Sequence, residues 1–437
     1  MDEAKLNGLK KQREVTKMGR PLEGIGVLAF TQIAAGPFGT VVLSDMGAEV
    51  IKIENVPGTD FPGTDDPEEI QVTPQIAHFW AYNRGTKGIC LDMRKQGARE
   101  VFIDLVKKSD VVYDNFRAGV PKKLEIDYDT IKQYNPRIIS CSVSGYGEDG
   151  PWRNQPSYDI IVQALTGVMS VTGEPGHMPV RCGVSFGDIG AGLFSAFGIV
   201  CALLERERTG VGQRIETSIF DVLLAFQSYR VPQTFGVGMK FAPEPMRSGT
   251  GQVPYGPFKT KDGSWISIAA GATRFWELLC KTIGREELIT DPRFNSLSKR
   301  QQHENEVAQV IEEALSTKTA KEWEQIFFKA GVPAGKVNSI EEAFQHPQTQ
   351  ARDMLISFDH PLGKKMKCAG NPLKLSTIKD QEYKPAPGLG EHTQEILSEL
   401  LGYSSDKVAK LKKEGVVWWP DRGITYGGGA ESALRRA

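Results

Sequence analysis

The sequence has no excess of charge of either sign. Its 437 residues include 53 Lys and Arg against 54 Asp and Glu, so the formal net charge at pH 7 is −1. This balance argues against nucleic acid or an anionic membrane as the main partner, because both require a strongly basic surface. We find no apolar run that reaches the roughly 18–20 residues of a transmembrane helix. The first 20 residues lack the apolar centre of a signal peptide, so we expect no membrane partner and a cytoplasmic location.

Cysteine and histidine are also scarce, with six residues of each type. The cysteines stand singly, without a CxxC pair, which is typical of reduced and mostly buried side chains. The histidines form neither an HExxH motif nor a clustered ligand set. The sequence therefore predicts no metal site.

Short apolar runs alternate with helix-like segments in the first part of the chain. Strands are predicted over residues 24–30, 49–54, 110–116 and 137–143, and helices over residues 38–46, 96–108 and 128–134. Strands separated by helices of about ten residues indicate βαβ units and a mostly parallel, Rossmann-like sheet. The first turn, residues 31–37, contains no GxGxxG motif, so a dinucleotide is not supported.

From residue 157 onward the pattern becomes more helical. Residues 189–205 are nearly all apolar or small, which predicts a buried helix. A short strand over 214–217 and a helix over 219–227 are predicted after it. Several Pro and Gly residues between 228 and 256 indicate a domain linker. A second unit is predicted beyond it, with a strand over 265–269 and helices over 273–283, 304–315 and 322–330, and residues 390–413 are predicted as a further helix.

One short motif points to a serine nucleophile. The segment Gly183-Val-Ser185-Phe-Gly187 matches the G-x-S-x-G nucleophile elbow, which requires a strand before Ser185 and a helix after it. A helix is predicted to follow, but Pro179 makes the preceding segment a poor strand. A serine hydrolase that uses Ser185 is therefore kept as an alternative.

Asp188 lies directly before the predicted buried helix, next to Gly187. Asp is a favoured residue at the N-terminus of a helix, so a purely structural role is one interpretation. The other is a nucleophilic carboxylate, because the neighbouring glycines would let a thioester approach closely. The helix dipole and free N–H groups would keep that carboxylate ionised. Both interpretations remain open at this point.

Cationic residues lie near predicted strand and helix ends of the first domain. If several of them share one edge of the sheet, they would suit a phosphorylated ligand lying across the strand ends. These residues are Lys52, Arg84, Lys87, Arg94, Arg117, Lys122 and Lys123. The Gly-rich segment 248–252 is predicted either as a mobile loop over a site or as a flexible linker.

An ordered set of motifs extends over residues 20–416. It starts with Pro21-Leu-Glu-Gly-Ile-Gly-Val-Leu28, Ala35-Gly-Pro37 and Asp45-Met-Gly-Ala-Glu-Val-Ile-Lys-Ile-Glu54. It continues with Asn83-Arg84, Asp114-Asn-Phe116, Gly119, Asn135-Pro-Arg137, Ser144-Gly-Tyr-Gly147, Gly187-Asp188 and Thr209-Gly-Val-Gly-Gln213. It ends with Pro333, Pro361 and Gly388-Leu-Gly-Glu-His392. This set closely resembles the class III CoA-transferases, also called the CaiB/BaiF family, which includes formyl-CoA transferase.

The resemblance implies an α/β fold in which a Rossmann-like, parallel-sheet large domain is built from both chain ends. A smaller α+β domain completes the chain, and two chains form an interlocked dimer. The implied segments are an N-terminal lead-in (1–20), the large CoA-binding domain (21–230), the small domain (235–345), a return segment to the large domain (346–416) and a C-terminal tail (417–437). The implied partner is a second copy of the chain, with a related subunit as the alternative.

The resemblance also implies a reaction, the transfer of CoA from an acyl-CoA to a free carboxylic acid. Asp188 matches the family's catalytic carboxylate, which forms an aspartyl mixed anhydride and then an aspartyl-CoA thioester. Succinyl-CoA is one candidate donor. CoA and acyl-CoA enter as substrates, and no permanently bound cofactor is expected.

The family's CoA contacts fall on a set of positions in the large domain. They are Ala34, Ala35, Asn55, Arg94, Asn115, Phe116, Arg117, Lys123, Ser157, Tyr158 and Asp159. Ala34 and Asn55 stand where formyl-CoA transferase has glutamine and arginine. Gly249 and Gly251 match the family's glycine loop over the aspartyl intermediate.

The same family contains α-methylacyl-CoA racemases, which move a proton with a histidine thirty residues before the aspartate. Here that position is Tyr158, and a phenol with a pKa of ~10 is a poor base near neutrality. The resemblance therefore favours a transferase over a racemase or epimerase. A non-catalytic partner subunit is a further alternative, although such a role needs no carboxylate at position 188.

Overall fold

The computed structural model describes residues 19–57, 74–243, 251–359, 365–376, 378 and 382–421. The chain divides into two compact units. Unit 1 comprises Met1–Thr166, Gly183–Gln227 and Asp353–Ala437, and unit 2 comprises Gly167–Cys182 and Ser228–Arg352.

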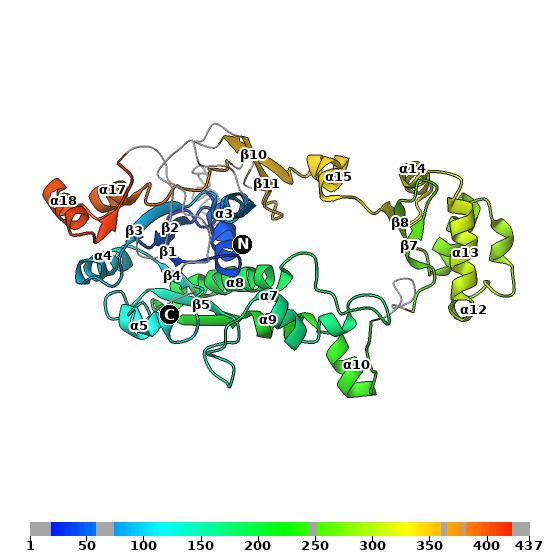
Figure 1. The fold of residues 1–437 in the computed structure, drawn as a ribbon, viewed down its shortest axis with the longest axis horizontal. Helices are drawn as coiled ribbons and strands as arrows, with labels where there is room; N and C mark the ends of the chain where they lie inside the picture. The colour runs from blue at the N-terminus through cyan, green and yellow to red at the C-terminus, as the bar shows by residue number, and fades with distance from the viewer. Residues whose placement is uncertain are drawn as a thin grey trace, which may run out of the picture. The chain divides into compact units, whose positions relative to one another are not determined.

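Unit 1 is built around a seven-stranded sheet with the strand order β12-β3-β2-β1-β4-β5-β6 (Figure 1). Its strands are β1 (Gly26–Phe30), β2 (Glu49–Glu54), β3 (Lys87–Leu91), β4 (Val111–Asp114), β5 (Ile139–Ser144), β6 (Arg214–Ser218) and β12 (Val417–Trp418). All pairs are parallel except β12 with β3. The order 3-2-1-4-5-6 is that of Rossmann folds. The predicted α/β fold with a mostly parallel sheet is confirmed.

The sequence analysis missed two of these strands. β3 is a short, buried strand, and β12 comes from the segment predicted as a C-terminal tail. Val417 pairs with Leu91 and is only 1% exposed, and Trp418 pairs with Cys90. The segment expected as a C-terminal tail, 417–437, therefore begins within the sheet of unit 1. The apolar side chains and backbone of Val417 and Trp418 cover an edge of the sheet that would otherwise stay open.

Helices cover both faces of the sheet. The helices of unit 1 are α2 (Ala35–Asp45), α3 (Pro74–Asn83), α4 (Gln96–Val106), α5 (Val120–Lys123), α6 (Tyr128–Ile131), α7 (Asp159–Leu165), α8 (Phe186–Thr209), α9 (Ile219–Phe226), α17 (Thr393–Glu395) and α18 (Ser405–Lys413). A hairpin of β10 (Leu355–Asp359) and β11 (Lys365–Ala369) belongs to the same unit.

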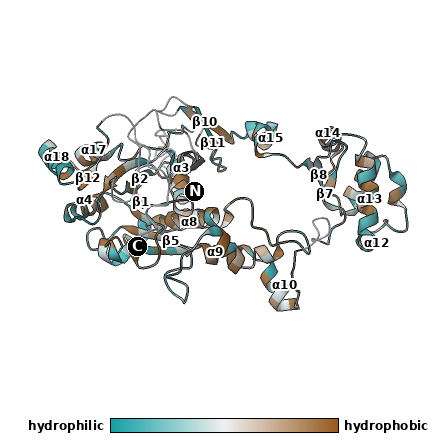
Figure 2. Ribbon diagram, in the orientation of Figure 1, coloured by the Kyte–Doolittle hydropathy of each residue, from teal (hydrophilic) through white to brown (hydrophobic). Residues whose placement is uncertain are grey.

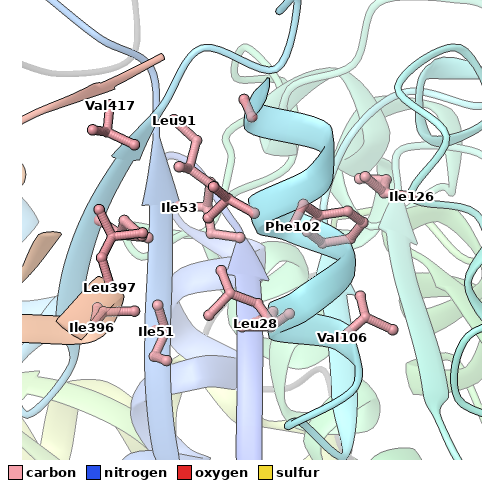
Figure 3. Close-up of a cluster of buried hydrophobic side chains, with 14 of the residues drawn as sticks. Leu28, Ile51, Ile53, Leu91, Phe102, Val106, Ile126, Ile396, Leu397 and Val417 are labelled. Carbon is pink, nitrogen blue, oxygen red and sulfur yellow. The ribbon is translucent and has the colours of Figure 1, made fainter. Parts of the chain in front are cut away.

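One face of the sheet packs against α4 and the C-terminal elements. Successive side chains of a strand point to opposite faces, so Leu28 and Phe30 join this core. Figure 3 shows the cluster, with Phe102 and Val106 of α4 beside strand residues and with Ile396, Leu397 and Val417 from the end of the chain. Each such large side chain stabilises the fold by about 1.5–3 kcal/mol on burial.

The C-terminal helix predicted over 390–413 is interrupted. α17 runs into a π-helical turn over Ile396–Leu400, and α18 starts only after Ser404. Gly402 has a φ of 69°, in the left-handed region that glycine adopts easily. The side chain of Ser404 accepts the backbone N–H of Lys407 and so begins α18 as a new helix.

α8 lies against α2, α9, β5 and β6 of unit 1 and is rich in apolar residues along its length (Figure 2). By length and composition it is apolar enough to cross a membrane, so the expectation that no such run exists was wrong. Half of its most apolar window is buried within the protein. A core helix of a globular domain has the same composition, so the helix alone is weak evidence for a membrane.

Unit 2 contains a three-stranded antiparallel sheet, β7-β8-β9, packed against helices. Its elements are α10 (Arg230–Val237), β7 (Tyr255–Lys259), β8 (Trp265–Ala269), α11 (Thr273–Thr282), α12 (Leu297–Gln302), α13 (Glu304–Leu315), α14 (Ala320–Ala330), β9 (Ala334–Lys336), α15 (Ile340–Gln345) and α16 (Pro347–Ala351), with 3₁₀ turns over Met169–Val171 and Glu286–Ile289. α10 lies in the segment predicted as a linker. Arg300 is buried in the core of unit 2, where its guanidinium donates to the carbonyls of Val253, Phe294 and Gly271.

Candidate active site

The residues predicted to contact CoA follow the carboxyl ends of five parallel strands. Ala34 and Ala35 follow β1, Asn55 follows β2, Arg94 follows β3, the segment 115–117 with Lys123 follows β4, and Ser157, Tyr158 and Asp159 follow β5. Because the carboxyl ends of parallel strands meet at one edge, the topology brings all of these positions to the same edge of the sheet. The strand order reverses between β1 and β4, and open α/β sheets bind ligands beside such a reversal.

The loop from β1 to α2 is held in place by side chains from neighbouring strands. Asn115 accepts the N–H of Gln32 at 2.8 Å and donates its amide to the carbonyl of Gln32 at 2.9 Å. Lys52 donates to the carbonyl of Thr31, and burial lowers the pKa of Lys52. Ile33 has a φ of 62°, which is rare for a β-branched residue. Backbone strain of this kind is commonly found at ligand-binding sites.

The start of α2 follows directly from this loop. Ala34 and Ala35 are buried, so their predicted contacts with CoA would be made through backbone atoms. Pro37 lies in the first turn, where its fixed φ is compatible with a helix.

The segment after β4 is organised by Asp114. One oxygen of Asp114 accepts the N–H of Phe116 at 3.1 Å, and the other accepts the Ser142 hydroxyl at 2.7 Å. Burial raises the pKa of Asp114 to about 7. The ring of Phe116 packs against Phe30, so Asp114 and Phe116 fix the backbone that presents Arg117 at the sheet edge.

The cationic residues do not all share this edge. Lys87 lies at the amino end of β3, at the opposite edge, where it pairs with Glu49 at 3.0 Å and Glu395 at 2.9 Å. Arg84 is buried in a pair with Asp45 at 2.7 Å. Lys87 and Arg84 therefore make structural ion pairs instead of joining the edge where the strands end, and Lys52 is bonded to the loop backbone.

Arg94, Arg117 and the two lysines of α5 remain at the edge where the strands end. Arg94 donates from Nε to Oδ1 of Asp92 at 2.8 Å and from Nη2 to Oδ2 at 3.0 Å, while much of the Arg94 side chain stays exposed. Arg117 is half-buried, and Lys122 and Lys123 are exposed. Asn55 is also exposed. These side chains are placed where a phosphorylated ligand could reach them.

Asp188 lies in the first turn of α8 and is half-buried. The residue before the helix, Ser185, makes no side-chain hydrogen bond to the helix N-terminus. Instead, an oxygen of Asp159 accepts the N–H groups of Gly187 at 2.9 Å and of Asp188 at 3.2 Å. Burial, together with the negative charge of Asp159, raises the pKa of Asp188 to about 7. The sequence analysis expected the helix N-terminus to keep Asp188 ionised; in the structure Asp159 accepts the N–H groups, while burial and the charge of Asp159 raise the pKa of Asp188.

A residue that the sequence analysis missed lies close to this carboxyl group. Burial, and to a smaller degree the charge of Asp188, raises the pKa of Tyr82 on α3. The Tyr82 ring contacts Phe38 of α2 and His78, and burial lowers the pKa of His78. No motif in the sequence links α3 to Asp188, so only the fold reveals this neighbourhood.

The serine hydrolase alternative loses its structural support. Residues 178–185 form no strand in the described part of the chain, although a nucleophile elbow requires one before the serine. Ser185 instead directly precedes α8. Tyr158, the residue at the racemase histidine position, is 55% exposed.

The predicted glycine loop is described only in part. Gly249 lies outside the described residues. Gly251 belongs to unit 2, has a φ of 68°, and its carbonyl accepts the side-chain amide of Gln301 on α12. Within the described residues, no group of three or more His, Cys, Asp or Glu side chains is arranged to hold a metal ion.

The raised pKa of Asp188 has a consequence for stability that Asp188→Asn will reveal. An acid whose folded pKa lies above its unfolded value destabilises the fold as pH rises, here between about 4 and 7. Because water still reaches part of this side chain, we expect Asp188→Asn to be more stable than the wild type by about 2 kcal/mol at pH 8. Urea unfolding at pH 8 and at pH 5 measures this gain in stability, which should be smaller at pH 5. An equal gain at the two pH values would contradict the explanation.

Comparisons with known proteins place the chain in a family. The model of CoA-transferase family III matches residues 22–393. The chain is 37% identical over 385 residues to acetyl-CoA:oxalate CoA-transferase of Acetobacter aceti, covering 87% of this chain and 96% of that protein. It is 33% identical over 405 residues to succinyl-CoA:glutarate CoA-transferase of Mus musculus, covering 91% and 90%.

A solved structure agrees with this assignment. A CaiB/BaiF family protein from Brucella suis superimposes with a TM-score of 0.77 at 34% identity, covering 88% of this chain and 100% of that one. The chain belongs to CoA-transferase family III, and it is a CoA-transferase.

Proposed function

We propose that this enzyme moves CoA from an acyl-CoA to a free carboxylic acid, with the Asp188 carboxylate as the nucleophile. Asp188 attacks the donor thioester carbonyl, the C–S bond breaks, and CoA thiolate leaves a mixed anhydride. The thiolate then attacks the aspartyl carbonyl and expels the donor carboxylate, which gives an aspartyl-CoA thioester. The acceptor carboxylate attacks the aspartyl-CoA thioester, which releases CoA thiolate and forms a second mixed anhydride. The thiolate then attacks the acceptor carbonyl, which gives the acceptor's CoA ester and regenerates Asp188, so no net proton is consumed.

The observation that supports this role most directly is the environment of Asp188. Burial and the neighbouring Asp159 raise its pKa to about 7. At pH 7.5 to 8 such a group is mostly ionised, yet it is more basic than an ordinary aspartate and hence a better nucleophile. Partial burial also limits access of water, which would hydrolyse both covalent intermediates.

The edge where the strands end supports the binding of CoA. Arg94, Arg117 and Lys123 supply positive charge for phosphate groups. The loop of residues 31–35 is fixed by Asn115 and Lys52. We assign this edge to the CoA portion of both donor and product, with Asp188 next to the thioester.

The acceptor is proposed to be a small dicarboxylic acid. The Acetobacter relative is named for oxalate and the mouse relative for glutarate, and both names describe acids with two carboxyl groups. Succinyl-CoA, named in the mouse relative, is the first donor to test.

The active form is proposed to be a dimer of identical chains. α8 has a stripe of apolar residues at alternating spacings of four and three, which lie on one side of a helix. The stripe consists of Leu193, Phe197, Val200 and Leu204, and Phe197 and Leu204 are 65% and 66% exposed. Exposed apolar surface of this kind is typical of an interface. Sedimentation equilibrium of the purified chain should give the mass of two chains, and the mass of one chain would contradict the proposal.

Trapping of the covalent intermediate tests the mechanism. The enzyme is incubated with succinyl-CoA and then treated with hydroxylamine, which should convert the activated aspartyl group to a hydroxamate. Peptide mass spectrometry should locate the modification at Asp188, and omission of the acyl-CoA should abolish it. Acylation of Ser185 in a sample that is not treated with hydroxylamine would instead favour a hydrolase. Chromatography of CoA esters after incubation with a panel of acids identifies the acceptor.

A further inference from the structure

Asp159 lies where two helices of unit 1 begin. It is the first residue of α7, yet its carboxylate also bonds to the first turn of α8. One oxygen accepts two N–H groups, from Gly187 and Asp188, and the other accepts the side-chain amide of the buried Gln163. Asp159 itself is only 7% exposed. The carboxylate is therefore engaged by three donors of the protein and turned away from solvent.

The contact between Asp159 and α8 depends on a glycine. A methyl group added at Gly187 would lie 2.7 Å from an oxygen of Asp159 and 2.9 Å from the Ile219 side chain. Ser185 provides no side-chain cap for α8. Asp159 thus supplies, from another helix, the hydrogen bonds that a capping residue ordinarily supplies.

The charge of Asp159 also reaches Asp188. The negative charge of Asp159 disfavours ionisation of Asp188. Among the residues that the structure describes, Tyr82 of α3 is a further titratable group that interacts with Asp188. The helices α2 and α9, which pack against α8, each contain one acidic residue. Asp45 of α2 pairs with Arg84, and Asp221 of α9 accepts the hydroxyl of Ser218.

We infer that Asp159 is a positioning residue, which holds the first turn of α8 so that Asp188 can attack the thioester, and that it is not a ligand of CoA. This inference rests on the proposed role of Asp188. It reassigns a residue that the resemblance places among the CoA contacts, on the ground that its oxygens already bond to the protein.

The isosteric variant Asp159→Asn separates the two roles. Its remaining carbonyl oxygen can still accept the N–H groups of residues 187 and 188, while the negative charge is lost. We expect the acidic limb of the pH profile of kcat/KM for acyl-CoA, which reports the free enzyme, to move to lower pH. The dissociation constant for CoA, measured by calorimetry, should stay within about twofold of the wild type. Asp129→Asn, which removes an exposed carboxylate on α6, is the matched control and should change neither quantity.

Asp159→Ala extends the test by removing the hydrogen bonds as well. We expect a loss of kcat of about 100-fold or more with little change in KM, because a small displacement of a catalytic group can cost that much. If this variant fails to fold, Asp159→Asn alone decides the question. A CoA dissociation constant raised about tenfold or more by Asp159→Asn, with an unchanged pH profile, would overturn the inference. Failure to trap wild-type Asp188 would instead overturn the proposed function.

Discussion

Asp188→Asn is expected to lower the rate of CoA transfer by at least ~10³-fold, because the amide cannot attack a thioester and no covalent intermediate can form. The change is isosteric, so the first turn of α8 and its bonds to Asp159 should persist. CoA binding should therefore remain close to that of the wild type. The measurement is the rate of CoA-ester exchange between succinyl-CoA and a dicarboxylic acid, followed by chromatography.

Ser185→Ala serves as the matched control for this variant. Ser185 precedes α8, makes no capping bond there and lacks the preceding strand of a nucleophile elbow. We expect this variant to keep most of the transfer activity. The mechanism fails if Asp188→Asn retains activity within tenfold of the wild type, or if Ser185→Ala is the variant that abolishes transfer.

Gly192→Ala is expected to destabilise unit 1 by about 3 kcal/mol, the upper part of the range for overpacked sites. Gly192 lies at the contact between α8 and α2. A methyl group there would lie 2.4 Å from the carbonyl oxygen of Ala35 and 2.9 Å from the backbone nitrogen of Gly39. Both are backbone atoms, so the two helices would have to move apart. Denaturant unfolding measures the loss, and we also expect slower transfer, since these helices hold Asp188 and the loop of residues 31–35.

Gly198→Ala on the same helix is the control for Gly192→Ala. Its added methyl group would lie 3.2 Å from a methyl group of the Ile215 side chain, which can adjust. Replacing a helix glycine by alanine usually gains about 0.5–1 kcal/mol, so we expect a neutral or slightly stabilised protein. Equal losses for the two variants would show that the close approach of α8 to α2 is not the cause.

The sequence predicted four of the parallel strands from short segments rich in apolar residues. β1, β2, β4 and β5 each contain at least four consecutive buried residues, and such runs separated by helices have few topologies available. The common edge for the predicted CoA contacts then follows from parallel pairing alone. β12 could not be predicted in this way, because two residues have no periodicity and pair with a strand from the first quarter of the chain.

The surroundings of Asp188 were also beyond the reach of sequence patterns. Asp159 and Gly187 are bonded across 28 positions, and Tyr82 is farther away still. Lys52 illustrates a second limit, since lysines are ordinarily exposed but this one is buried and bonded to Thr31. A lysine at this position was expected to be solvated or to bind a ligand. Its hydrogen bond shows instead that Lys52 holds the backbone of the loop after β1.

The pairing of β12 with β3 has a consequence for how the chain folds during synthesis. Translation delivers the six parallel strands of the sheet within the first half of the chain, while the segment that pairs with the outer side of β3 emerges from the ribosome only near the end. Until then the hydrogen-bonding groups of Lys87–Leu91 on that side have no strand to join, a condition that favours association with other nascent chains. Ribosomes stalled shortly before residue 417 should therefore display nascent chains that chaperones bind.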